Sequence, residues 1–271
     1  MRTDTTQFNE VLWTHYNAHG RHELPWRQPE SDGAFDPYKI LVSELMLQQT
    51  QVSRVILKFH EFIINFPTVG SLATAPLADV LKLWSGLGYN RRAKFLWLAA
   101  QKVVTDYAGV IPSALPELIS LPGVGSNTAG AILAYAYNEP AEFLETNVRT
   151  VYIHHFFNDQ TAVPDKLLLE RLQATLDREH PREFYWALMD YGSYLKQTVG
   201  NASKFSATYA KQSKFKGSKR QIRGQVLRAL GDGPHTAQML NEMIADDRLA
   251  AVLNDLVHEN LINKTADGYR L

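Results

Sequence analysis

The sequence predicts an all-α protein with a small winged-helix-like module at its C-terminal end. Apolar residues recur at helical spacing through most of the chain, which indicates amphipathic helices around a shared core. Strand patterns are almost absent before residue 260. The last part of the chain, about 55 residues, combines three helical stretches with a hairpin turn at Asp267-Gly268. The 271 residues suffice for one large domain or two smaller ones.

Prolines and glycines divide the helical part of the chain. A loop over 22–37 follows the first helix and is rich in both residues. The turn Gly86-Leu87-Gly88-Tyr89 separates two later helices, and Pro122-Gly123-Val124-Gly125 connects two more. Helices are expected over 7–17, 38–49, 52–65, 74–85, 91–107, 115–121, 127–137, 148–157, 166–176 and 182–195.

The C-terminal part begins with a polar, basic arm over 200–217. Apolar residues then return at helical spacing over 222–230, which predicts a helix. Thr236 is suited to cap a second helix that ends at Ile244, and Asp246 to cap a third. Segments 261–265 and 269–271 flank the hairpin turn. Three helices and a hairpin are typical of a winged-helix-like domain.

Composition excludes several classes of protein. The chain is 45% hydrophobic and 21% charged, so it is not disordered as a whole. No run of about 18 uncharged apolar residues could span a membrane, and the first ten residues lack the apolar core of a signal peptide. We therefore expect a cytoplasmic protein without a membrane partner.

Cysteine is absent, which excludes disulfides, thiolate zinc sites, all-cysteine iron–sulfur clusters and cysteine nucleophiles. His15, His19 and His22 have helical spacing and could share a face of one helix. Gly20 and Pro25 indicate that this helix ends before His22, so no metal site is expected.

The net charge of zero conceals an asymmetry. Between Lys196 and Arg228 there are nine basic residues and no acid. From Ala229 onward there are seven acids against three basic residues. The basic block can bind a polyanion although the whole chain is neutral.

The pentapeptide Leu121-Pro122-Gly123-Val124-Gly125 lies between two predicted helices. Its glycines allow backbone conformations that a side chain would forbid, and the following helix begins with free N–H groups near Thr128. Such a hairpin can hold a phosphate. By itself it could equally be a plain turn between two helices.

Further motifs accompany this hairpin in a fixed order. They are Leu24-Pro25-Trp26-Arg27, Ser43-Glu44-Leu45-Met46-Leu47-Gln48-Gln49-Thr50, Gly86-Leu87-Gly88-Tyr89 and Asn147-Val148-Arg149. Over residues 8–195 the set resembles the helix-hairpin-helix DNA glycosylases, and among them the adenine glycosylases of the MutY type. The resemblance implies a two-lobed fold in which a duplex lies across a cleft and one nucleotide is flipped out. It divides the chain into a helical barrel over 30–140, a second helical domain from 1–29 and 141–216, and the winged-helix-like domain over 217–271.

Two carboxyl groups carry the chemistry that this resemblance implies. Glu44 lies in an apolar helical segment, where burial would keep a proton on it near neutrality, and it would protonate the departing base. Glu145 stands where the family has an aspartate that stabilises the sugar cation. Its extra methylene would displace the carboxylate by about 1 Å, an error that can cost about 100-fold in rate. Asn147 matches a family residue beside this carboxylate.

Asn127 stands where bifunctional relatives have a lysine that forms a Schiff base with the sugar. An amide cannot do so, which predicts base release without strong strand cleavage.

The resemblance assigns base-pocket positions to His22, Leu24, Trp26, Arg27, Asn127 and Trp186. Trp186 replaces a common acid and His22 lies near a usual arginine, so the pocket differs from that of the family.

The DNA contacts implied by the resemblance come from several motifs. Gln48 and Gln49 would fill the gap left by the flipped base, and Tyr89 would be the inserted wedge. A core role for Tyr89 is the alternative. Arg91 and Arg92 follow the wedge and would contact phosphates or solvent. The remaining candidates are the hairpin residues Gly123, Val124, Gly125 and Thr128 with the arm lysines Lys204 and Lys211.

The family pattern breaks at its iron–sulfur loop and beyond it. Counting from Lys196 places Ser203, Ser206 and Gln212 where the family has cysteines, so no cluster and no other cofactor is expected. The family's large 8-oxoguanine-recognition domain is not expected here, because residues 217–271 are too few to form it; they could replace it as a DNA contact or serve a structural role. Its third helix carries Asp246, Asp247, Asp255 and Glu259, which is unusual for a recognition helix.

These observations predict a monofunctional, nucleoid-associated glycosylase that acts as a monomer on double-stranded DNA with a mismatch or damaged base. Adenine opposite guanine or 8-oxoguanine is the expected substrate. A mismatch thymine or uracil glycosylase is the first alternative. A DNA-binding protein without catalysis is the second.

Overall fold

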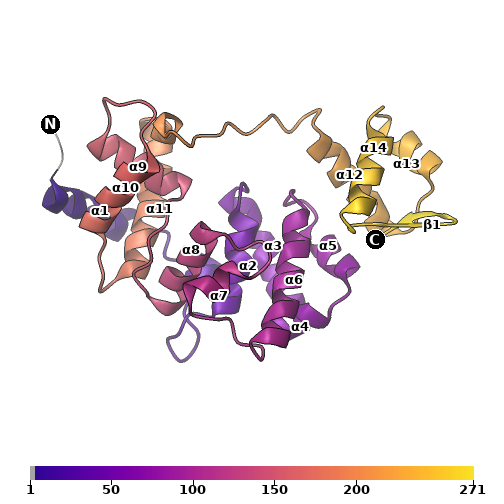
Figure 1. Cartoon of the computed structure of the whole chain (residues 1–271), viewed down its shortest axis with the longest axis horizontal. Helices are drawn as coiled ribbons and strands as arrows, with labels where there is room; N and C mark the ends of the chain where they lie inside the picture. Colours follow the sequence, from indigo (N-terminus) through magenta and orange to yellow (C-terminus); the bar gives the residue numbers. More distant parts are fainter. Residues whose placement is uncertain (1–3) are drawn as a thin grey trace. The chain divides into compact units, whose positions relative to one another are not determined.

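The computed structural model describes residues 4–271 and is almost entirely helical (Figure 1). Contacts divide the chain into two compact units, each assembled from separate parts of the sequence. Unit 1 comprises residues 1–40, 113–119 and 124–211. Unit 2 comprises residues 41–112, 120–123 and 212–271. No helix among the described residues is long and apolar enough to cross a membrane.

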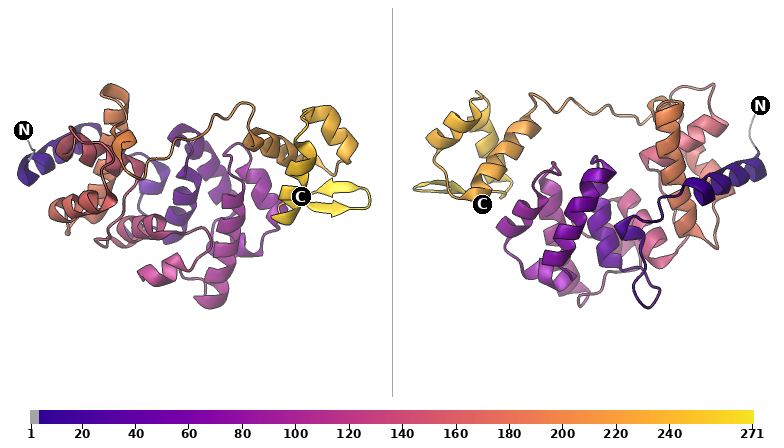
Figure 2. Two further views of the ribbon diagram at one scale, coloured as in Figure 1. Left: turned by 45° about the horizontal axis from the view of Figure 1, so that its top comes forward. Right: turned by 180° about the vertical axis from the view of Figure 1, so that it is seen from behind.

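Unit 1 is built around α11, which packs against α1, α8 and α9 (Figure 2). Aromatic side chains fill its core, with Phe8, Tyr152 and Tyr185 fully buried. The unit contains α1 (Thr5–His19), η1 (Pro25–Arg27), α7 (Leu115–Ile119), α8 (Ser126–Tyr137), α9 (Thr146–Phe156), α10 (Asp165–Thr175), α11 (Pro181–Thr198) and η2 (Ala202–Phe205). Helix α1 ends before His22, as expected, because the chain is extended at Gly20.

Unit 2 contains the second helical core. Helix α6 packs against α4 and α5, and Trp84 and Phe62 are fully buried between the helices. Its helices are α3 (Val52–Asn65), α4 (Val69–Thr74), α5 (Leu77–Trp84) and α6 (Arg91–Asp106), and α2 (Pro37–Leu47) enters it at Leu41.

The C-terminal module, residues 219–271, belongs to unit 2 and packs through α12 against α5. It consists of α12 (Lys219–Asp232), α13 (Ala237–Ile244), α14 (Leu249–His258) and the antiparallel strands β1 (Asn263–Thr265) and β2 (Gly268–Arg270). His235 adds an isolated bridge to Tyr269, which extends the hairpin by one short segment. This arrangement agrees with the winged-helix-like expectation.

The structure confirms the all-α prediction and corrects two local ones. The helix predicted over 74–85 is α5, which begins only at Leu77, and Thr74 is instead the last residue of α4. Helix α4 begins in a capping box formed by Thr68 and Ser71, and Pro76 separates it from α5 because its ring cannot continue a helix. Asp246 is not the N-cap of α14; Arg248 is, and the Asp246 carboxylate accepts hydrogen bonds from the Arg248 N–H and guanidinium.

Candidate functional site

Glu44 lies in the middle of α2 and is partly buried. Leu41, one helical turn before Glu44, is fully buried. So are the immediate neighbours of Glu44, Ser43 and Leu45. Among these neighbours the apolar spacing of the helix leaves Glu44 at the edge of the core. A carboxyl group in such surroundings is suited to general acid chemistry.

Arg92 holds the C-terminal end of the same helix. Its guanidinium donates to the main-chain carbonyls of Leu45 (2.6 Å), Met46 (3.0 Å) and Gln48 (2.5 Å). Burial lowers the pKa of Arg92 to about 10. Arg92 is therefore neither solvated nor a free phosphate contact, contrary to the sequence interpretation, because its charge satisfies carbonyls that the helix end leaves unpaired.

Glu145 is the N-cap residue of α9. Burial raises the pKa of its carboxyl group, while the N–H of Thr146 and the charges of Arg149 and Lys196 oppose this shift. Arg149 already forms a bidentate ion pair with Asp165. Lys196 is therefore the less compensated cation facing Glu145, and burial lowers the pKa of its ammonium group while Glu145 opposes that shift.

Two asparagines position the chain around Glu145. The Asn127 side chain donates to the carbonyl of Leu144 (3.0 Å) and accepts from its N–H (3.3 Å), so it clamps the residue before Glu145. The Asn147 Oδ1 atom accepts a hydrogen bond from Lys196 Nζ at 2.7 Å. A Cβ on Gly192 would lie 2.7 Å from the Cβ of Asn147, so α9 and α11 approach closely at this point only because residue 192 is glycine.

The hairpin between α7 and α8 leaves main-chain amides available. Gly123 has a φ of +79°, and a Cβ there would lie 2.7 Å from the Cβ of Phe95, so only glycine fits. Gly125 is the exposed N-cap of α8 and offers no side-chain oxygen to its first turn. Val124 and Thr128 are buried, so an anion here would meet N–H groups.

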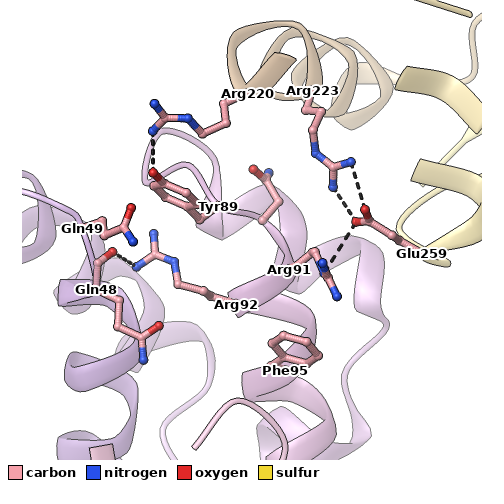
Figure 3. Close-up of a pocket in the computed structure, with 10 residues that line it drawn as sticks. Gln48, Gln49, Tyr89, Arg91, Arg92, Phe95, Arg220, Arg223 and Glu259 are labelled. Atoms are coloured by element: carbon pink, nitrogen blue, oxygen red, sulfur yellow. Dashed lines mark hydrogen bonds and ion pairs between the residues drawn. The ribbon is translucent and has the colours of Figure 1, made fainter. Parts of the chain in front are cut away.

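Tyr89 and Gln49 share an unusual backbone conformation. Their φ angles are +47° and +55°, in the left-handed region that non-glycine residues adopt rarely. Both line one pocket of unit 2 with Gln48 (Figure 3). Gln212 Nε2 donates to Gln49 Oε1 (3.1 Å) and to the Tyr89 hydroxyl (2.5 Å). Tyr89 is therefore not a core residue; its ring lines an accessible pocket.

Two of the expected base-pocket residues, Arg27 and Trp186, meet at a buried ion pair in unit 1. The Asp190 carboxylate accepts from both terminal nitrogens of Arg27 (2.8 and 2.9 Å) and from the N–H (2.8 Å) and Nε (2.7 Å) of Arg21. Trp186 is buried, with the Arg27 guanidinium carbon 5.2 Å from its ring centre and Tyr135 stacked beside it. Leu24 and Trp26 are also buried, whereas His22 is exposed against Tyr16.

The positions counted for cluster cysteines do not fit an iron–sulfur cluster, since none supplies a thiolate. Ser203 and Ser206 are buried and hydrogen-bonded: the Ser203 hydroxyl donates to Asn201 Oδ1 at 2.6 Å, and Ser206 pairs with Val163 through a β-bridge. Lys196 donates to Asn147, and Gln212 belongs to unit 2. No group of three metal-ligating side chains occurs within residues 4–271.

The other expected DNA contacts are exposed side chains. Lys204 and Lys211 lie in the basic arm, and Arg91 is 63% exposed at the start of α6. Sequence reasoning did not anticipate the roles of Lys196, Asp190 and Arg220. An acid such as Asp190 within a buried helix face is a signal for a buried ion pair, but its partners cannot be read from the spacing.

Comparisons with known proteins agree with this arrangement. Residues 42–175 match the family described as HhH-GPD superfamily base excision DNA repair protein. The chain is 36% identical over 192 residues to an adenine DNA glycosylase of Buchnera aphidicola, and the match covers 70% of this chain and 53% of that protein. The chain thus spans about half the length of this relative.

A second relative matches over nearly its whole length. It is an adenine DNA glycosylase of Mycolicibacterium smegmatis, 34% identical over 271 residues, with 92% of this chain and 91% of the relative covered. Among solved structures, a thermostable thymine-DNA glycosylase is similar with a TM-score of 0.60 and 26% identity, covering 70% of this chain and 86% of that one.

Proposed function

This chain belongs to the HhH-GPD superfamily of base excision DNA repair proteins, and from that premise we propose that it is a monofunctional adenine DNA glycosylase. It hydrolyses the N-glycosidic bond of adenine opposite guanine or 8-oxoguanine in double-stranded DNA. The observation that most supports a hydrolytic role is Glu145, a partly buried carboxyl group at the start of α9 that interacts with the charge of Lys196. A partly desolvated carboxyl group placed against a cation is typical of a reacting site.

The two carboxyl groups take complementary roles in this proposal. Glu44 gives its proton to the leaving base, so that the base departs as a neutral molecule. Glu145 is ionised in the reacting state and stabilises the positive charge that develops on the sugar. Lys196 supports the ionised form of Glu145, and Asn127 holds the main chain of Leu144 so that the longer side chain is correctly placed.

The lack of strong strand cleavage in this proposal follows from Asn127. Its amide is not nucleophilic and is already hydrogen-bonded to Leu144, so it cannot form a Schiff base with the sugar. The product is therefore an intact strand with an abasic site.

We also propose that the protein works without an iron–sulfur cluster. The bridge between Ser206 and Val163 supports this proposal, because it ties the segment to the rest of unit 1 without a metal. One chain supplies both carboxyl groups, so the protein would act as a monomer on DNA of the nucleoid.

A mismatch thymine glycosylase is the second candidate. The likeness to a thymine-DNA glycosylase and the aromatic group formed by Trp186, Tyr135 and Phe35 favour it. Thymine needs less protonation at a ring nitrogen than adenine does. Glu44→Gln would therefore slow thymine release less than adenine release.

The test is a panel of labelled duplexes with A opposite 8-oxoguanine, A opposite G, T opposite G, U opposite G and an undamaged control. Each is incubated with excess protein and then treated with hot alkali, which cuts at abasic sites. We expect cleavage at adenine that requires alkali. Glu44→Gln should abolish this cleavage and keep duplex binding within about threefold, since only the proton donor is lost.

Three outcomes would contradict the proposal. Cleavage confined to T or U would establish the second candidate. Duplex binding without any cleavage would favour a DNA-binding protein without catalysis. Strand cleavage without alkali at the rate of base release would refute the monofunctional assignment.

A further inference from the structure

The pocket that contains Tyr89 is formed jointly by α6, the segment after α2 and the C-terminal module (Figure 3). Its volume is about 500 Å³, which is within the range of ligand-binding pockets. It is lined by Gln48, Gln49, Tyr89, Asn90, Arg91, Arg92, Phe95, Arg220, Arg223 and Glu259. Four arginines face it and only one carboxylate, so an anionic ligand is favoured.

Glu259, just after α14, pairs with α12 inside the C-terminal module and also contacts α6. The Glu259 carboxylate accepts from Arg223 at 2.5 and 3.2 Å and lies 3.9 Å from Arg91 Nε. The Glu259 carbonyl accepts from Lys94 Nζ at 2.5 Å. These contacts give Glu259, one of the four acids in this region, a structural role. The basic helix α12 faces the pocket.

Within residues 4–271, the hydrogen-bond partners of Arg220 on α12 are Tyr89 and Ser213, and neither is an acid. Its guanidinium donates to the Tyr89 hydroxyl at 2.6 Å and to the carbonyl of Ser213 at 2.6 Å, and lies 5.0 Å from the Tyr89 ring centre. These partners are neutral, so they fix the orientation of the Arg220 guanidinium without neutralising its positive charge. Arg223 is neutralised by Glu259, and Arg92 serves the end of α2.

We propose that this pocket binds a backbone phosphate of the DNA strand beside Tyr89, with Arg220 and Arg91 as the donors. The C-terminal module is then part of the DNA interface, and its contribution is independent of base sequence. A planar guanidinium held in one orientation is well matched to two oxygens of a phosphate. The position of the strand at Tyr89 rests on the proposed function.

The proposal predicts a defined salt dependence. Each phosphate contact adds about 0.9 to the slope of log affinity against log salt. Losing one contact lowers the affinity about eightfold at 0.1 M salt, since ten to the power 0.9 is about eight. The loss should be the same for every sequence tested.

The experiment measures binding of the full chain by fluorescence anisotropy between 50 and 300 mM salt. The duplex carries a tetrahydrofuran abasic-site analogue, so that binding needs no base release. The variants are Arg220→Gln and Arg91→Ala. Because the Arg91 side chain is exposed, a loss of binding in Arg91→Ala cannot be attributed to unfolding of the protein. Arg228→Gln is the matched control, because Arg228 is exposed on the same helix and does not line the pocket.

We expect Arg220→Gln and Arg91→Ala each to reduce the salt slope by about one and Arg228→Gln to leave it unchanged. An equal loss in Arg228→Gln, an unchanged slope in both pocket variants, or tighter binding by Arg220→Gln would overturn the proposal. So would a wild-type chain that does not bind the duplex. A wild type that binds as expected but releases no base would refute the proposed function and leave the phosphate site supported.

Discussion

Asp190 is the buried carboxylate that joins segment 21–27 to α11, and Asp190→Asn removes its charge with little change in volume. The Asp190 side chain is 2% exposed and that of Arg27 is 4% exposed, so water cannot solvate the Arg27 charge after the change. Arg27 Nε already has no hydrogen-bond partner within the described residues. The substitution would leave both guanidinium groups, those of Arg21 and Arg27, without their counter-ion.

The magnitude follows from this burial. Removing one partner of a buried ion pair costs about 3–5 kcal/mol, because the other charge stays buried. For a chain of this size 1 kcal/mol corresponds to about 2 °C in Tm, so the expected decrease is about 6–10 °C. The matched control is Asp165→Asn in the same unit. The Asp165 side chain is 35% exposed and that of its partner Arg149 is 16% exposed, so water reaches this pair and its loss should cost less than that of Asp190, about 1 kcal/mol.

The assay is differential scanning calorimetry of both variants at several pH values. Burial by itself would raise the pKa of Asp190, but the hydrogen bonds and charge of Arg27, together with Arg21, outweigh it and lower the pKa below 3.8. The stabilisation is therefore present above about pH 4 and lost as the pH falls through the lowered pKa. A decrease in Tm below about 2 °C for Asp190→Asn, or an equal decrease for Asp165→Asn, would refute the reasoning.

Two further predictions concern the reacting carboxyl group and the strained turn. Because burial raises the pKa of Glu145 above its usual value of 4.5, single-turnover base release should fall as the pH is lowered through a midpoint above that value, and Glu145→Gln should abolish base release. A midpoint at or below 4.5 would contradict this. Gln49→Gly should raise the free energy of unfolding by about 1 kcal/mol, because glycine adopts the positive φ without strain, and weaken duplex binding. Gln48→Gly is the control, because Gln48 has no positive φ, and this variant should lower the free energy of unfolding measured in urea. A lower free energy of unfolding for Gln49→Gly would disprove the assignment of strain.

The helical fold could be predicted because its signals are local. The apolar spacing predicts α3 over its whole length. Gly20 predicts that α1 ends before His22, as the structure shows. The hairpin turn at Asp267-Gly268 also agrees with the paired strands β1 and β2. Helix α4 escaped prediction because it is short and is stabilised by a capping box rather than by a periodic apolar face.

The candidate site could be predicted as a set of residue types but not as a set of contacts. The motifs singled out Glu44, Glu145 and Tyr89 by their order along the chain. They could not show that Asn127 clamps Leu144, because these residues are far apart in sequence and meet only through packing. The spacing identifies Lys196 only as a position where the family has a cysteine. It cannot show that the Lys196 amine donates a hydrogen bond to Asn147.

The amino-acid sequence by itself determined the all-α class, the family resemblance and the lack of thiolate ligands, since each depends on residue identity and short-range spacing. Only the tertiary structure decided which charges are compensated. It buried Arg27 on Asp190, placed Arg92 at the end of α2 and brought Arg220 to Tyr89. The physical reason is that the interaction of a charge depends on its burial and its distance from partners, and both are set by long-range packing.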